Sequence, residues 1–190
     1  MKQAFAFLIV PLALVSFAFS AVTAQQPGPT EGWRQTERTD PVRGDYTRYT
    51  LVGKFLKAPA GDSSARPSLT VDCSTHNRSH KPKFVRGTLV VGDPLKIDWV
   101  EPEEIHGTSY FPKVDVLYRL NDAKEDKEQW TPSTDKTSAS FSKSSLEKML
   151  RVHTVEITAQ DQGGASVVMQ FAIPESSVIG QGCDVDQSKK

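Results

Sequence analysis

The chain has 190 residues, with 23 basic and 23 acidic side chains, four histidines and two cysteines. This balanced charge provides no basic excess to attract nucleic acid or an anionic membrane surface, so neither is expected as a partner. The length suits a single domain that is large enough to bury a substantial core.

The first 24 residues have the layout of a secretory signal peptide. Lys2 supplies a short positive region, an apolar run covers residues 5–19, and small side chains at Val22 and Ala24 occupy the −3 and −1 positions of a cleavage site. The alternative is a membrane anchor, for which the apolar run is too short to span comfortably. We therefore expect residues 1–24 to be removed and the mature protein to be periplasmic or secreted, without stable insertion in a membrane.

Three further parts follow the signal peptide. Residues 25–44 are rich in Gln, Pro, Thr and Gly and are expected to form a flexible polar leader. Residues 45–183 are expected to form a single β-rich domain, and residues 184–190 a polar tail.

Within the domain, apolar and polar side chains mostly alternate, which is typical of strands with one buried and one solvated face. Asp161–Gly164 joins the last two alternating runs, and its glycines favour a tight hairpin. The apolar sets are, in chain order, Leu69, Val71 and Cys73; Leu95, Ile97 and Trp99; Val114, Val116, Tyr118 and Leu120; Val155, Ile157 and Ala159; and Val167, Met169, Phe171 and Ile173.

One segment has helical spacing instead. Residues 146–150 place Leu, Met and Leu at positions i, i+3 and i+4, which predicts a short helix. Its N-cap is either Ser144, with Glu147 completing a capping box, or Ser142, with Phe141 packing onto the first leucine. Together these patterns predict a mainly β fold, an antiparallel β-sandwich or partly open barrel with one short helix.

The two cysteines, Cys73 and Cys183, are expected to form an intramolecular disulfide, because two cysteines in an oxidising compartment usually pair. Free thiols and an intermolecular bridge are the alternatives. Cys73, His76 and His80 also have a zinc-like spacing, but the set lacks a fourth ligand and Cys73 is better used in the disulfide. The sequence therefore predicts no metal and no cofactor.

Catalytic patterns are weak in this chain. It has no G-x-S-x-G turn, phosphate-binding glycine loop or dinucleotide fingerprint. Glu101, Glu103 and Glu104 lie beside His106, where they could bind a cation or act as acid and base, although a solvated acidic loop is the simpler interpretation. The alternative function is accordingly a small secreted hydrolase of envelope polymers, with Glu103 or Asp135 as the acid and a histidine.

The most distinctive polar segment, residues 118–130, reads as a strand that leads into a charged loop and an aromatic residue. Arg119 has the opposite parity to Tyr118 and is expected on the solvated face. An exposed Arg near a Trp is a common recognition pair, so Arg119 and Trp130 are candidate partner contacts. In the alternative interpretation Trp130 covers the core while the charges keep the loop soluble.

Several segments resemble one family. Residues 66–73 are similar to its opening core strand, residues 118–122 with Trp130 and residues 133–135 to its middle strand and charged loop, and residues 141–183 to its C-terminal half. The family is the VasI-like (TagO-like) group of periplasmic proteins associated with type VI secretion, together with similar exported bacterial proteins. The resemblance implies the same kind of fold and disulfide and brings no catalytic residues. Because no nucleophile with its base, four-ligand metal set or cofactor loop is in view, we expect a non-enzymatic binding or accessory domain of the bacterial envelope. The near-neutral charge favours another envelope protein as its partner.

Overall fold

The structure of the protein is a computed structural model. It describes residues 32–41, 44–60, 65–74, 84–100, 110–174, 179 and 183. The predicted signal peptide, the first part of the polar leader, the polar tail, His76, His80 and the acidic loop with His106 lie outside the described residues.

Eleven strands and one helix are present in the described part of the chain. The strands are β1 (Arg34–Asp40), β2 (Gly44–Val52), β3 (Lys54–Lys57), β4 (Ser68–Cys73), β5 (Val85–Val90), β6 (Asp98–Val100), β7 (Phe111–Leu120), β8 (Asp126–Pro132), β9 (Ser138–Phe141), β10 (Thr154–Gln160) and β11 (Ser166–Ala172), and the helix α1 is Lys143–Leu150.

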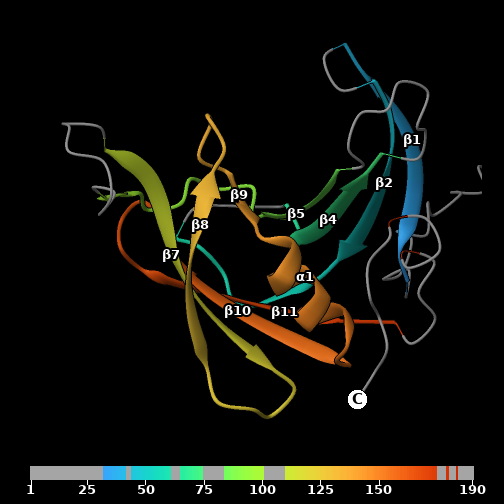
Figure 1. The fold of residues 1–190 in the computed structure, drawn as a ribbon. Helices are drawn as coiled ribbons and strands as arrows, with labels where there is room; N and C mark the ends of the chain where they lie inside the picture. Colours follow the sequence, from blue (N-terminus) through green and yellow to red (C-terminus); the bar gives the residue numbers. More distant parts are fainter. Residues whose placement is uncertain are drawn as a thin grey trace, which may run out of the picture.

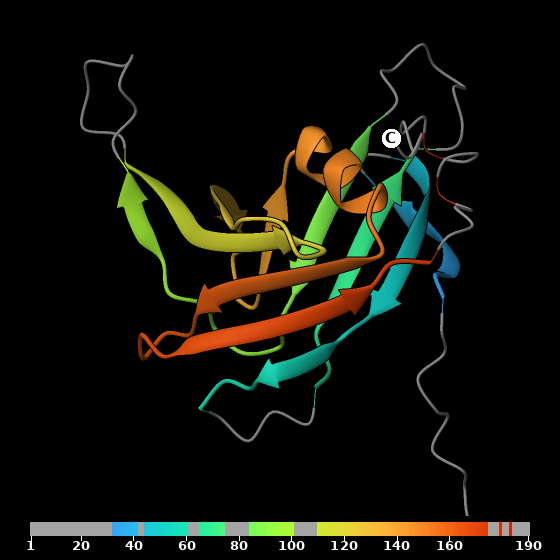
Figure 2. The same ribbon diagram turned by 90° about the horizontal axis from the view of Figure 1, so that it is seen from below.

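Ten of these strands form one antiparallel sheet that curves into a half-barrel, as Figures 1 and 2 show. Their order is β1-β2-β4-β5-β9-β8-β7-β10-β11-β3, and β6 pairs with β7 beside this path. The predicted mainly β fold is therefore confirmed in its partly open form with one short helix.

The core fills the concave side of the sheet, and the alternating apolar sets supply it. On β10 and β11, Val155, Ile157, Val167, Met169 and Phe171 are fully buried, while the residues between them are more exposed. The hairpin between these strands is also as predicted. The set that starts at residue 95 forms a shorter strand than its alternation suggested, because β6 begins only at residue 98.

The sheet begins earlier than the composition suggested. β1 lies within residues 25–44, the segment expected to be a flexible leader, and pairs with β2 from Arg34 opposite Thr50 to Asp40 opposite Gly44. Most of its side chains are exposed. That expectation is therefore wrong for residues 34–40, because backbone pairing on a sheet edge can hold a polar strand whose side chains bury little surface.

Gly53 connects the two ends of the sheet. It stands between β2, which pairs with β4, and β3, which pairs with β11. A Cβ atom at Gly53 would lie 2.5 Å from the Phe171 ring and 2.7 Å from the Gln170 carbonyl oxygen, so the position has no room for a side chain. The backbone N–H of Gly53 donates to the Pro67 carbonyl at 2.8 Å. The close approach lets one continuous segment pair with β4 before Gly53 and with β11 after it.

The helix α1 covers one end of the half-barrel (Figure 2). Ser142 is its N-cap, and the Ser142 side chain accepts a hydrogen bond from the backbone N–H of Ser145. Phe141 and Leu146 are both buried in the core, which fits the second of the two predicted caps. The helix thus starts at Lys143 and buries its apolar side against the sheet.

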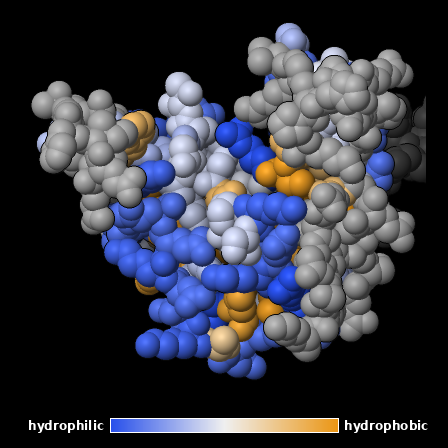
Figure 3. Space-filling view, viewed as in Figure 1, coloured by the Kyte–Doolittle hydropathy of each residue, from blue (hydrophilic) through white to orange (hydrophobic). Residues whose placement is uncertain are grey.

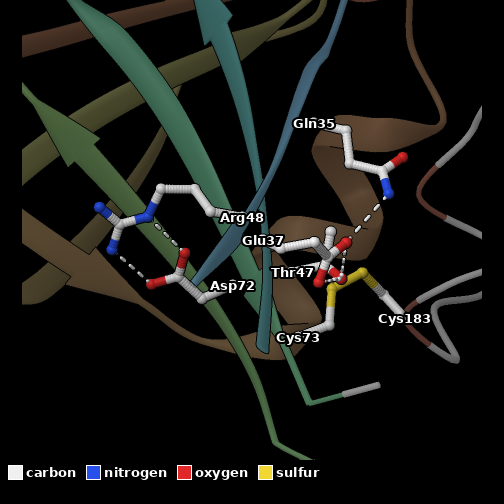
Figure 4. The surroundings of a disulfide bond; sticks show 7 residues. All are labelled: Gln35, Glu37, Thr47, Arg48, Asp72, Cys73 and Cys183. Atoms are coloured by element: carbon white, nitrogen blue, oxygen red, sulfur yellow. Dashed lines mark hydrogen bonds and ion pairs between the residues drawn. A yellow bond between two sulfur atoms is a disulfide. The ribbon is translucent and has the colours of Figure 1, made fainter. Parts of the chain in front are cut away.

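The predicted disulfide between Cys73 and Cys183 is present in the structure (Figure 4). Both cysteines are buried, and their Cα atoms lie 5.3 Å apart. The bond joins the end of β4 to the C-terminal part of the chain. On the neighbouring strands, the Arg48 guanidinium donates to both carboxylate oxygens of the buried Asp72 at 2.7 and 2.8 Å.

Candidate functional site

Arg119 lies on the solvated face of β7, as its parity predicted, and its side chain is 41% exposed. It forms an ion pair with Glu156 on the adjacent strand β10. The hydrogen bond from Arg119 to this carboxylate raises the pKa of Arg119. The guanidinium is accessible, but it is already paired within the sheet.

Trp130 is only 1% exposed, so its assignment as a partner contact is wrong. The indole packs against the rings of Tyr118 and Phe141, with ring centroids 6.4 and 4.7 Å away. Trp130 lies opposite Val114 in the β7–β8 register, and both side chains point into the core. The weighed alternative, in which the tryptophan belongs to the core, is the observed one.

Glu128 is a polar centre that the sequence reasoning missed. Its carboxylate accepts hydrogen bonds from Ser145 Oγ at 2.6 Å, Tyr118 OH at 2.7 Å and Trp130 Nε1 at 3.0 Å. Lys148 Nζ lies 3.9 Å away. The parity shared by Glu128 and Trp130 was the available signal, because it points the glutamate toward the core side of β8. Glu128 therefore joins β7 and β8 to α1.

The hydrogen bonds decide the charge of Glu128. Burial alone would raise the pKa of Glu128, but the hydrogen bonds from Ser145, Tyr118 and Trp130, with the positive charge of Lys148, outweigh burial and hold the pKa below its ordinary value. A cavity of about 610 Å³ opens beside this carboxylate, between β8, the end of β9 and the start of β5. Because the Glu128 contacts are all internal, we assign this cluster a structural role.

A second, larger cavity lies where the half-barrel is open, beside Gly53. Its volume is about 860 Å³, and we call it the seam groove. The described residues that line it are Gly32, Leu51, Val52, Gly53, Lys54, Phe55, Arg66, Pro67, Gln170, Ala172, Ile173 and Pro174.

The seam groove lies where two strand pairings stop, that of β3 with β11 and that of β1 with β2. β3 accompanies β11 only as far as Gln170, which pairs with Lys54. β1 accompanies β2 only as far as Thr50, which pairs with Arg34. Beyond these points, residues at the ends of β2 and β11 line the space beside Gly53.

The walls of the seam groove are mainly apolar and its polar rim is positive. Val52, Phe55 and Ala172 contribute accessible apolar surface, while Lys54 and Arg66 contribute two cationic side chains. Among the described residues that line the groove, none is acidic. The groove therefore suits an apolar ligand that also carries a negative charge.

Arg119, the predicted partner contact, lies in the same row of cross-strand neighbours as the groove residues Gln170 and Lys54. On the sheet surface it pairs with Glu156, which pairs with Gln170 on β11, which pairs with Lys54 on β3. The row spans four adjacent strands, so Arg119 lies two strand spacings, roughly 10 Å, from Gln170 at the groove. A partner larger than the groove would reach Arg119 along this row.

Of the residues named for a hydrolase, Asp135 lies in the described part of the chain. Asp135 lies exposed in the turn between β8 and β9, where its carboxylate accepts hydrogen bonds from Ser133 Oγ and the Thr137 N–H. These hydrogen bonds, that from Ser133 first, lower the pKa of Asp135. Glu103 and His106 lie outside the described residues.

Metal binding, membrane spanning and surface hydropathy can also be assessed for the described part of the chain. It holds no group of three or more His, Cys, Asp or Glu side chains that could bind a metal ion. None of its helices is long and apolar enough to cross a membrane. Where described residues form the face seen in Figure 3, that face is mostly hydrophilic, with small hydrophobic patches.

Comparison of the chain with protein-family models, curated protein sequences and solved structures finds no match.

Proposed function

We propose that the protein is an exported, non-enzymatic binding domain of the bacterial envelope and that the seam groove is its binding site. The observation that carries the proposal is the groove itself, an apolar space of about 860 Å³ with a cationic rim at the opening of a half-barrel. Its volume falls within the range of ligand-binding pockets in proteins, roughly 300–1,000 Å³.

Export is supported by two independent features. The first 24 residues have the layout of a cleaved secretory signal. The buried disulfide between Cys73 and Cys183 is typical of proteins that work in an oxidising compartment. Another envelope protein is the partner that this location favours.

The binding proposal is tested with a phage-displayed library of random linear peptides, selected against the mature domain. Ala172 lines the groove and is exposed, so Ala172→Trp places a large side chain in the groove without disturbing the core. We expect selected peptides to lose about tenfold or more in affinity for this variant, measured by isothermal titration calorimetry.

The matched control is Ala123→Trp, because Ala123 is equally exposed but lies in the turn between β7 and β8, away from the groove. This variant should bind the selected peptides like the unmodified protein. If both variants bind every selected peptide with unchanged affinity, the seam groove is not the binding site.

A further inference from the structure

Resting on the proposed function, we infer that the seam groove takes an extended strand of a partner protein, which inserts between the ends of β2 and β11 and presents a carboxylate to Lys54 or Arg66. Backbone hydrogen-bonding groups on both sides of the groove carry this inference.

Ala172 presents the first pair of backbone groups. The N–H of Ile173 donates to the His153 carbonyl at 2.7 Å, so the backbone groups of Ile173 face β10. Because these groups alternate in direction along a strand, the N–H and C=O of Ala172 face the opposite side. β3 pairs with β11 only up to Gln170, so the Ala172 groups face the groove without a strand beside them in the described part of the chain.

Val52 presents the second pair. The hydrogen bond from Gly53 N–H to the Pro67 carbonyl shows that the Gly53 N–H faces the β4 side. By the same alternation, the N–H and C=O of Val52 face away from β4, toward the side on which β1 lies. The β1 ladder ends two residues earlier, with Arg34 opposite Thr50. The Val52 groups therefore lie beyond the end of the β1 ladder.

The conformation of Gly32 supports the end of the β1 ladder at this point. If β1 continued in register, Gly32 would be the residue opposite Val52. Its φ is +134°, outside the range of a regular strand, so the backbone turns out of the ladder there. Val52 and Ala172 thus resemble the open edges to which extended peptides add as an extra strand.

The side chains specify the kind of strand. Alternate residues of an inserted strand would face the apolar surface of Phe55, which favours apolar side chains at every second position. Lys54 and Arg66 favour an acidic side chain or a terminal carboxylate near one end. An apolar, extended segment with one carboxylate is therefore the expected occupant.

The leader of this chain fits the groove less well. Residues 25–31 read Gln-Gln-Pro-Gly-Pro-Thr-Glu, with no large apolar side chain to match the groove. Two of the seven residues are prolines, which lack the N–H that strand pairing uses. We therefore assign the occupant to a partner protein.

The test uses a peptide selected from the library, with a single N-methyl group introduced at each backbone amide in turn. Adjacent amides of an extended chain point to opposite sides, one toward Val52 and the next toward Ala172. We expect methylation of two adjacent central amides to weaken binding about tenfold each, and methylation near the ends to have little effect.

If no single N-methyl group weakens a peptide whose affinity still falls for Ala172→Trp, the inserted strand is refuted and the proposed binding site still stands. If the affinity of the peptides does not fall for Ala172→Trp, the proposed binding site itself is refuted. Competition by a synthetic peptide of residues 25–31 would overturn the assignment to a partner in favour of the chain's own leader.

The charge preference is tested separately with Lys54→Gln and Arg66→Gln. We expect at least one of these substitutions to lower the affinity for an acidic peptide several-fold at low salt. The loss should be smaller at high salt, because exposed charges are screened. Lys57→Gln is the matched control, since Lys57 is exposed on the same strand as Lys54 but does not line the groove. Equal binding by all three variants would refute the carboxylate preference.

Discussion

Replacement of Glu128 by alanine should destabilise the domain through the three hydrogen bonds that its carboxylate accepts. All three donor residues, Tyr118, Trp130 and Ser145, are almost fully buried. The Ser145 hydroxyl can turn to Ser142 Oγ, which lies 2.7 Å away. Lys148 Nζ donates to the Tyr118 hydroxyl and cannot accept its proton. The Tyr118 O–H and the indole N–H of Trp130 therefore lose their acceptor without an internal substitute.

The magnitude follows from these donors. A buried donor left without an acceptor costs about 1–3 kcal/mol, and hydrogen bonds to a charged group contribute about 1.5–3 kcal/mol each. Two orphaned donors and one weakened hydrogen bond give an expected loss of about 2–4 kcal/mol for Glu128→Ala, because water from the neighbouring cavity can replace part of the carboxylate. For a domain of this size that corresponds to a fall in Tm of about 5–15 °C.

Urea denaturation at pH 7, monitored by tryptophan fluorescence, measures the free energy of unfolding. Glu125→Ala is the matched control, because Glu125 is an exposed glutamate just before β8 and accepts none of these hydrogen bonds. Its unfolding free energy should stay close to that of the unmodified protein. A Glu128→Ala variant within about 0.5 kcal/mol of the unmodified protein would refute the role of this carboxylate.

The same carboxylate should make stability depend on pH. The folded protein lowers the pKa of Glu128, so the stabilisation is fully present above the unfolded-state value, about 4.3, and is lost as pH falls through the lower folded value. Glu128→Gln removes this titrating group. The difference in unfolding free energy between the unmodified protein and Glu128→Gln should therefore shrink as pH falls from 6 to 3, and a constant difference would contradict the assignment.

Two further predictions concern the disulfide and the exposed arginine. Cys73→Ser opens a loop of 110 residues, which in the chain-entropy model costs about 5 kcal/mol and lowers Tm by roughly 10–20 °C in differential scanning calorimetry; an unchanged Tm under non-reducing conditions would contradict this. Arg119→Ala should change Tm little, because the Arg119–Glu156 pair is partly exposed. The variant should nevertheless weaken capture of a purified envelope partner, once one is identified; a large fall in Tm would show that Arg119 is structural.

The local features of this fold could be read from the sequence because they depend on neighbouring residues. Alternation predicted the buried faces of β10 and β11, and Asp161–Gly164 predicted the hairpin between them. The spacing at residues 146–150 predicted α1. The disulfide followed largely from the cysteine count, since the sequence contains only Cys73 and Cys183.

The tertiary structure decided the features that depend on strand register. Trp130 belongs to the core because β8 pairs with β7 in the register that sets it opposite Val114, and the sequence permitted a surface position equally well. The same register turns Glu128 toward Ser145, which lies 17 positions further along the chain. Such contacts result from the summed energy of a whole strand pair, which no local window of sequence contains.

The candidate site depends on longer-range pairing still. The seam groove requires β3 to pair with β11, more than 100 residues later in the chain, while β2 pairs with β4. The polar strand β1 was missed for the same reason, since its partner β2 holds it by backbone hydrogen bonds. Side-chain periodicity determines which face of a strand is buried. The closure of the half-barrel is determined by which strands pair with each other in the folded chain.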